Sequence, residues 1–173
     1  MEQEYEFDGS GGWALALANG NLVCSGPLVP GFPEALVKLF RQELGSGIYG
    51  LFTGLAIQPH SAYQSSCMGR VIAYSPPHLV VADPCWSTTG AIPVSGMIKS
   101  FAVDQALDTI LVDAADGAYG GYWPFGAGAY LGQNFGRALC LKGDTLFVGF
   151  GPTMSGASAH IEVFRKNPVA GWD

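Results

Sequence analysis

Three stretches of this sequence carry the same apolar pattern at the same internal spacing. They occupy residues 12–27, 69–84 and 136–151 and align without a gap: in each, a glycine opens a short apolar run and a leucine opens a second one. A further apolar run that ends in phenylalanine follows each stretch, at Phe40, Phe101 and Phe164. Sequence repeats of this kind predict structural units that stack on one another. The chain is therefore expected to fold as a series of similar units.

Each unit has the composition of a strand, a tight turn, a strand, a loop and a strand. Residues 18–21, 75–78 and 142–145 are rich in turn formers and stand between apolar runs, which is typical of a hairpin. The runs are largely apolar on both faces, as in a sheet that packs between other sheets. Such a unit buries its faces only by stacking on further copies.

Two sequence signals in residues 33–45 predict different secondary structures. The segment has a proline at its start, apolar residues at helical spacing and a glycine at its end, and local rules interpret this pattern as a helix. The repeat register instead makes residues 36–41 a strand, because the equivalent residues 160–165 alternate in strand fashion. We favour the strand and keep the helix as the alternative.

Composition narrows the class of protein. The 173-residue chain has a formal net charge of −6, and charged residues make up 13% of it, about half of the usual share of roughly 25%. An acidic chain without a basic stripe is not expected to bind nucleic acid. Its 25 glycines and 11 prolines argue against helix bundles and coiled coils, and its 49% apolar residues argue against disorder. The expected fold class is all-β.

The N-terminal residues and the long uncharged runs indicate whether the chain is secreted or inserted into a membrane. Residues 1–8 are acidic where a secretory signal is basic and then apolar, so we expect no Sec-type signal and synthesis in the cytoplasm. The uncharged runs at 44–69 and 117–136 contain too many polar residues or glycines to span a bilayer. Membrane insertion is therefore not expected.

Four cysteines occur, and their spacing matches no zinc site. Without a secretory signal, Cys24, Cys67, Cys85 and Cys140 are all expected to be free thiols. Cys24 and Cys140 stand within apolar runs, where a thiol usually behaves as a small buried hydrophobic group.

The third copy of the repeat resembles a known family. The stretch Phe135–Leu139, the stretch Gly143–Gly149 that begins with Gly-Asp, and the strand Ile161–Phe164 together resemble the FG-GAP repeat. In that family the repeat builds the β-propeller blades of integrin α subunits and of many microbial surface proteins. The second copy matches less well, with Met68 in place of the phenylalanine, and the first copy is weaker still. Because the motif is largely structural, it implies a fold rather than a function.

The resemblance implies about three propeller-like blades in a single repeat domain over residues 1–173, with units at approximately 5–45, 46–105 and 106–173. A closed propeller needs roughly four to eight blades, so we expect other subunits, in a homo-oligomer, to complete the ring. Joining two chains would leave 21 residues from Phe164 to the next Gly12, against 29 and 35 between the equivalent residues within the chain. Two chains of three units would make six blades.

Little in the sequence points to chemistry. Many FG-GAP proteins hold calcium with an Asp-x-Asp-x-Asp-Gly loop, but residues 113–117 lack its alternating oxygen ligands, so no metal is expected. The chain contains no nucleophile elbow, zinc-protease motif, phosphate loop or dinucleotide fingerprint. His60, His78 and His160 fall in different parts of the repeat and are interpreted as surface or turn residues. We expect no cofactor and no enzymatic activity.

A glycine-rich aromatic loop at residues 117–130 is the most distinctive local feature, and a second, weaker candidate is the loop at 84–90. Aromatic rings with polar tips suit stacking on sugars or contact with another protein. The alternative, which we favour, is an aromatic plug that packs between blades or subunits. The candidate binding residues of the two loops are Tyr119, Tyr122, Trp123, Phe125, Tyr130 and Trp86.

These observations lead to three hypotheses of function. The leading one is a non-catalytic structural or interaction protein whose propeller units assemble between subunits, for instance as a component of a virion or tail. The second is a lectin-like module that binds a receptor or a glycan through the aromatic loop. The third is a hydrolase or lyase on a propeller scaffold, for which the sequence offers no acidic cluster.

Overall fold

The computed structural model describes residues 14–27, 35–57, 67–85, 96–104, 106, 109–112, 122–123, 134–151, 159–167 and 171–172. Every regular element in these residues is a β-strand, so the expected all-β class is confirmed. The strands form three antiparallel sheets, and none of these sheets closes into a barrel within the described residues. The propeller-type ring stays a prediction.

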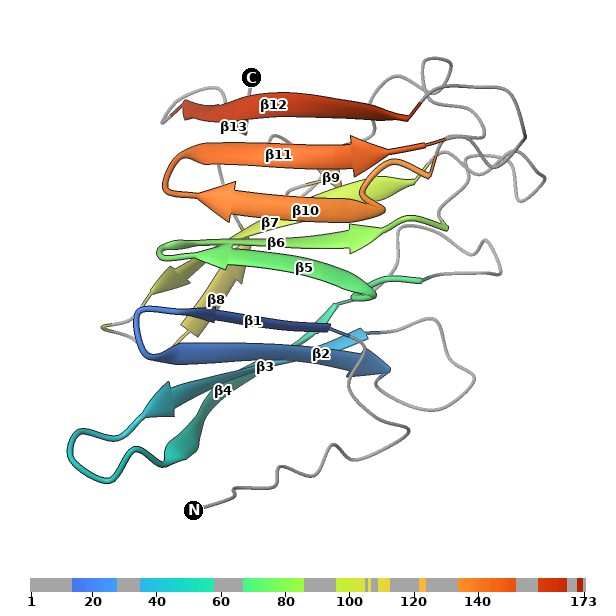
Figure 1. Ribbon diagram of the computed structural model, residues 1–173. Helices are drawn as coiled ribbons and strands as arrows, with labels where there is room; N and C mark the ends of the chain where they lie inside the picture. Colours follow the sequence, from blue (N-terminus) through green and yellow to red (C-terminus); the bar gives the residue numbers. More distant parts are fainter. Residues whose placement is uncertain are drawn as a thin grey trace.

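The main four-strand path of each sheet is a meander in which consecutive strands are neighbours (Figure 1). The first sheet contains β1 (Ala14–Ala18), β2 (Asn21–Pro27), β3 (Ala35–Gln42) and β4 (Tyr49–Ile57). The middle sheet contains β5 (Val71–Ser75), β6 (His78–Asp83), β7 (Met97–Asp104) and β8 (Thr109–Val112), with β9 (Tyr122–Trp123) paired to β7. The third sheet contains β10 (Ala138–Lys142), β11 (Thr145–Phe150), β12 (His160–Asn167) and β13 (Gly171–Trp172).

The pairing registers of the three sheets follow the sequence repeat. The leucine of each copy lies directly opposite the phenylalanine of the same copy on the next strand: Leu22 opposite Phe40, Leu79 opposite Phe101, and Leu146 opposite Phe164. The two residues that close each first hairpin are also equivalent, at 19–20, 76–77 and 143–144. Sequence positions that align in the repeat therefore occupy the same place in their sheets.

Local turn chemistry explains the first hairpin. Asn19 and Gly20 connect β1 to β2 and both have positive φ, of 49° and 74°. Asparagine and glycine tolerate that conformation, and a two-residue turn of this type matches the right-handed twist of the strands that it joins. The expected hairpin is confirmed at this position.

The ambiguous segment at 33–45 forms a strand over Ala35–Gln42, so the favoured alternative is confirmed. β3 pairs with β2 on one side and with β4 on the other. Val37 and Leu39, two residues apart, are both fully buried, which is the burial period of a strand. Tertiary packing of this face overrides the local helix signals. The first sheet continues to Ile57, beyond residue 45 where the sequence analysis ends the first unit, because β4 pairs with β3.

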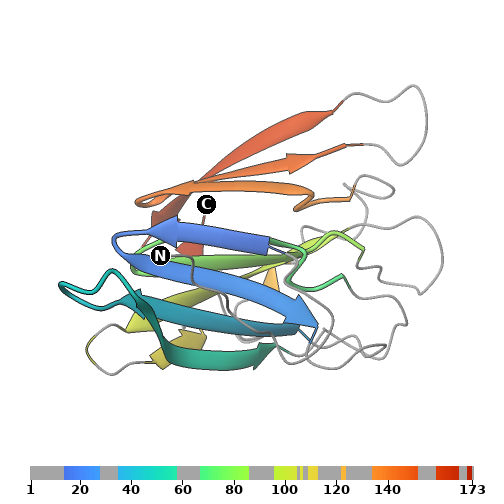
Figure 2. The same ribbon diagram turned by 60° about the horizontal axis from the view of Figure 1, so that its bottom comes forward.

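The three sheets lie in a stack, with the middle sheet between the other two (Figures 1 and 2). We call the face of a sheet that is equivalent to the Ile72 and Tyr74 face of β5 its front face, and the opposite face its back face. The front face of the middle sheet packs on the back face of the first sheet, around Val23, Val37, Leu39, Leu79 and Phe101. The back face of the middle sheet packs on the front face of the third sheet, around Val80, Ile98, Leu146, Val148 and Phe164. The middle sheet is thus buried on both faces, as its apolar runs predict.

A close backbone contact also joins the middle sheet to the third. Gly96 and Phe135 form an isolated parallel bridge just before β7 and β10. Gly96 has a φ of 77°, and a side chain there would meet the backbone of Phe135. Phe135 is itself 1% exposed and packs against Phe150 and Phe164. This bridge sets the distance between two layers of the stack.

Candidate functional site

The residues that the sequence analysis proposes as a binding site are not brought together in the part of the chain that the structure describes. Trp86, Tyr119, Phe125 and Tyr130 lie outside the described residues. Tyr122 and Trp123 form β9, whose backbone pairs with Lys99 and Ile98 of β7. The hypotheses of glycan binding and of an aromatic plug both stay predictions.

A different surface stands out at the two ends of the stack. Nine large apolar side chains in the described residues are exposed, and six of them lie on the front face of the first sheet or the back face of the third sheet. The first group is Leu15, Leu17 and Leu51, and the second is Phe147, Ile161 and Val163. Contiguous exposed apolar side chains are uncommon on soluble monomers and mark contact surfaces.

The exposed front face of the first sheet repeats the pattern of two buried faces. Leu17 is 65% exposed, whereas Tyr74, at the equivalent position of the middle sheet, is 6% exposed. Leu15 is 69% exposed, against 7% for its equivalent Ile72. Leu17 belongs to a row that runs across the sheet through Leu22 and Phe40 to Leu51. Phe40 and Cys24 are buried on this face, so the open part lies along β1 and β4.

The exposed back face of the third sheet shows the same relation to the buried back faces. Ile161 is 71% exposed, whereas its equivalents Val37 and Ile98 are 0% and 1% exposed. Phe147 and Val163 lie opposite each other on β11 and β12, and Cys140 lies opposite Phe147 on β10. These side chains form one apolar row across the sheet.

Cys140 is exposed within this row, and the expectation that it is buried is wrong. Its equivalent in the middle sheet, Ala73, is 6% exposed because the third sheet covers it. The chain supplies no fourth sheet in the described residues to cover Cys140. Cys24 is buried as expected, and burial raises the pKa of its thiol above the usual 9.0, while nearby Lys38 lowers it.

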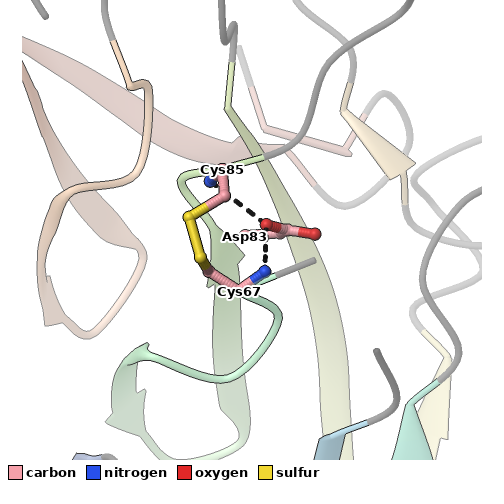
Figure 3. Close-up of side chains that lie close together, drawn as sticks. All are labelled: Cys67, Asp83 and Cys85. Atoms are coloured by element: carbon pink, nitrogen blue, oxygen red, sulfur yellow. Dashed lines mark hydrogen bonds between the residues drawn. A yellow bond between two sulfur atoms is a disulfide. The ribbon is translucent and has the colours of Figure 1, made fainter. Parts of the chain in front are cut away.

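The expectation of four free thiols is also wrong, because Cys67 and Cys85 form a disulfide (Figure 3). Cys67 precedes β5 and Cys85 follows β6, so the bond closes the base of the first hairpin of the middle sheet. Cys67 lies nine residues before Pro76 and Cys85 lies eight residues after Pro77, so antiparallel pairing of the hairpin brings the two cysteines close together. That spacing about the turn was the available signal in the sequence.

A buried carboxylate holds the same hairpin base. Asp83 is 0% exposed, and one of its oxygens accepts hydrogen bonds from the backbone N–H of Cys67 at 2.8 Å and of Cys85 at 3.2 Å (Figure 3). Lys99 of β7 is 4% exposed. Burial lowers the pKa of Lys99 to about 8, and the negative charge of Asp83 acts in the opposite direction.

Cys67, Asp83 and Cys85 are the one group of potential metal ligands that lies together in the described residues. The two sulfurs are bonded to each other, so neither is a thiolate donor. The Asp83 carboxylate oxygen already accepts two backbone hydrogen bonds. The donor set therefore fits a structural role at the hairpin base rather than a metal site.

Polar contacts connect the middle and third sheets. His78 Nε2 lies 3.0 Å from Asp144 Oδ1, between the two first-hairpin turns, and the backbone N–H of Gly143 donates to Ser75 Oγ at 2.9 Å. Trp172 Nε1 donates to Ser100 Oγ at 3.0 Å. The rings of Trp172 and His78 also make a T-shaped contact, with their centroids 5.6 Å apart. These contacts orient one sheet on the other, which is a structural role for His78.

No protein-family model matches the chain, and no curated protein matches it significantly. Among the described residues there is also no helix with the length and apolar character needed to cross a membrane.

Because the comparisons with known proteins assign no site, the candidate functional site is defined by geometry alone, as the pair of end faces. Sequence reasoning assigned their residues to strands but did not single them out as a site, because it treats every copy of the repeat as an interior one.

Proposed function

We propose that this is a non-catalytic structural or interaction protein whose propeller-like units assemble with those of a second copy of the chain. One observation carries the proposal: both end faces of the stack expose apolar side chains at positions where the internal faces bury them. The clearest examples are Leu17, which is far more exposed than its equivalent Tyr74, and Ile161, which is far more exposed than its equivalent Ile98.

Apolar burial supplies enough free energy to favour such an assembly. Fully burying one leucine, isoleucine, valine or phenylalanine side chain contributes about 1.5–3 kcal/mol. Each end face offers three exposed side chains of this kind. Association must also offset the loss of rotational and translational freedom, so several such side chains on each face are required. A contact between one front face and one back face would bury six such side chains, which meets this requirement.

The described titratable groups support a structural interpretation of the chain. The Asp83 carboxylate accepts backbone hydrogen bonds at the base of a hairpin. It also interacts electrostatically with the buried Lys99 ammonium group. His78 and Asp144 join two turns. An open hollow lies beside these turns and is lined by Asn19, Pro76, Pro77, Ala102, Val103, Asp104 and Leu111. Its described lining residues include a single titratable side chain, Asp104, whereas acid–base chemistry commonly needs a matched pair.

Native mass tests the proposal directly. Light scattering behind a sizing column, over a range of protein concentrations, is expected to give a mass near twice the 18.1 kDa of the chain. That mass corresponds to a ring of six units. A mass of one chain at every concentration, with the protein folded by circular dichroism, would overturn the proposal.

A further inference from the structure

We propose that the two copies bind head to tail: the back face of the third sheet of one chain packs on the front face of the first sheet of the other. This inference rests on the proposed function and adds its polarity. The alternatives are symmetric contacts, in which front meets front or back meets back. The two internal interfaces of the chain distinguish between these arrangements.

The first internal interface pairs small residues with large ones. At the back of the first sheet, β1 presents Ala14, Ala16 and Ala18, which pack against the core shared with the middle sheet. At the front of the middle sheet, β5 presents Ile72 and Tyr74 to the same core. β1 and β5 lie against each other in the stack. A strand with alanines on its back thus accommodates a strand with bulky side chains on its front.

The second internal interface follows the same rule. The back of β5 presents Val71 and Ala73, and the front of β10 presents Leu139 and Leu141. Val71, Leu139 and Leu141 pack against one common core, and β10 lies against β5. Where the first strands of two sheets meet, both interfaces therefore combine smaller side chains at the back with larger ones at the front. Close packing requires this kind of complementarity in volume.

The two exposed faces continue the series. The back of β10 presents Ala138 and Cys140, which are small, and Lys142 at its turn end, while the front of β1 presents Leu15 and Leu17, which are large. Head-to-tail contact reproduces the volumes of the two internal interfaces. Front-to-front contact would place leucines on leucines, and back-to-back contact would leave Ala138 and Cys140 facing small residues across a gap. The contacts of β1 with β5 and of β5 with β10 show neither combination.

A mixing experiment separates these arrangements. Leu17→Glu places a charge on the front face alone, and Cys140→Glu places one on the back face alone; both positions are exposed, so both variants are expected to fold. With head-to-tail contact each variant alone is expected to be largely monomeric, since every interface contains one altered face. An equimolar mixture is expected to recover dimers, because one interface then joins two unaltered faces.

The outcomes are distinguishable by native mass. If one variant dimerises alone and the other stays monomeric, the two copies meet through the same face, so the contact is symmetric and the head-to-tail inference is overturned, while the proposed assembly stands. If both variants dimerise alone, Leu17 and Cys140 lie outside the contact and the head-to-tail inference is overturned as well. If the unaltered protein is monomeric, the proposed function itself fails. Leu44→Glu is the matched control: Leu44 is fully exposed in the β3–β4 turn, away from both faces, and its variant is expected to dimerise as the unaltered protein does.

Discussion

At the scale of single residues, Gly96 holds the most demanding backbone position of the described chain. A Cβ added at Gly96 would lie 2.2 Å from the carbonyl oxygen of Phe135 and 2.4 Å from its nitrogen, and the φ of 77° already disfavours other residues. Backbone atoms cannot move aside as flexible side chains do. A side chain at residue 96 would therefore force the backbones of the middle and third sheets apart at this point.

Gly96→Ala is expected to lower the free energy of unfolding by roughly 3 kcal/mol or more, because it combines backbone strain with a clash. Gly143→Ala is the matched control: its φ is also positive, at 54°, but nothing lies within 4 Å of the added Cβ. That variant is expected to lose only about 1 kcal/mol. Urea denaturation of the two variants measures the difference, and equal losses would contradict the assigned role of the Gly96–Phe135 bridge.

The lowered pKa of Lys99 leads us to expect that the free energy of unfolding depends on pH. Its pKa is lowered by burial from 10.5 to about 8, so between these values the unfolded chain binds more protons than the folded one. The cost of burying the charge is therefore present at neutral pH and is relieved as the pH rises above about 8. Between pH 7 and pH 9.5 this group is expected to add about 1 kcal/mol to the free energy of unfolding, after allowance for solvent screening.

Lys99→Met isolates this contribution. The variant lacks the titrating group, so its free energy of unfolding is expected to lack that rise, and the difference from the unaltered protein is the quantity to measure in urea. The raised pKa of Cys24 acts with the opposite sign above pH 9, but both proteins share it and it cancels in the difference. Parallel pH profiles for the two proteins would show that Lys99 is not the responsible group.

At the scale of strands and hairpins, much of the fold was predictable because the repeat aligns equivalent residues. The leucine–phenylalanine pair seen at Leu22 and Phe40 recurs at equivalent positions in all three sheets. The alignment with residues 160–165 also predicted the strand at Ala35–Gln42, although the local residues favour a helix. The disulfide was missed because the expectation of free thiols came from cellular compartment rather than geometry. Only the hairpin register shows that Cys67 and Cys85 meet.

The Cys67–Cys85 bond is expected to stabilise the middle sheet by constraining the unfolded chain. The cysteines are 18 residues apart, and a loop of that size corresponds to about 3 kcal/mol. Replacing both cysteines by serine should lower the free energy of unfolding by that amount, and addition of a reductant to the unaltered protein should do the same. Cys140→Ser, at an exposed position, should leave it unchanged when measured on the monomer. Four reactive thiols in the denatured, unreduced protein would contradict the bond.

At the scale of the whole molecule, burial depends on place in the stack rather than on strand pattern. Leu17, Tyr74 and Leu141 occupy equivalent positions, yet Tyr74 and Leu141 are covered by the preceding sheet and Leu17 is open. Sequence reasoning predicted units that need neighbours, but it could not say which faces lack them until the order of the layers was known. For the same reason the candidate site was expected in the aromatic loop, whereas the exposed apolar residues of the described chain lie mainly at the two ends.

Cys140 offers a measurement of assembly that needs no substitution. It lies on the open back face of the third sheet, so its thiol should react freely in the monomer and be covered by Leu15 and Leu17 of a second copy in the dimer. When nine-tenths of the chains are paired, alkylation under native conditions should slow by about tenfold, because only the free chains react. Leu17→Glu should react at the monomer rate at every concentration. A dimeric protein whose Cys140 reacts at the monomer rate would require a contact that leaves this face open.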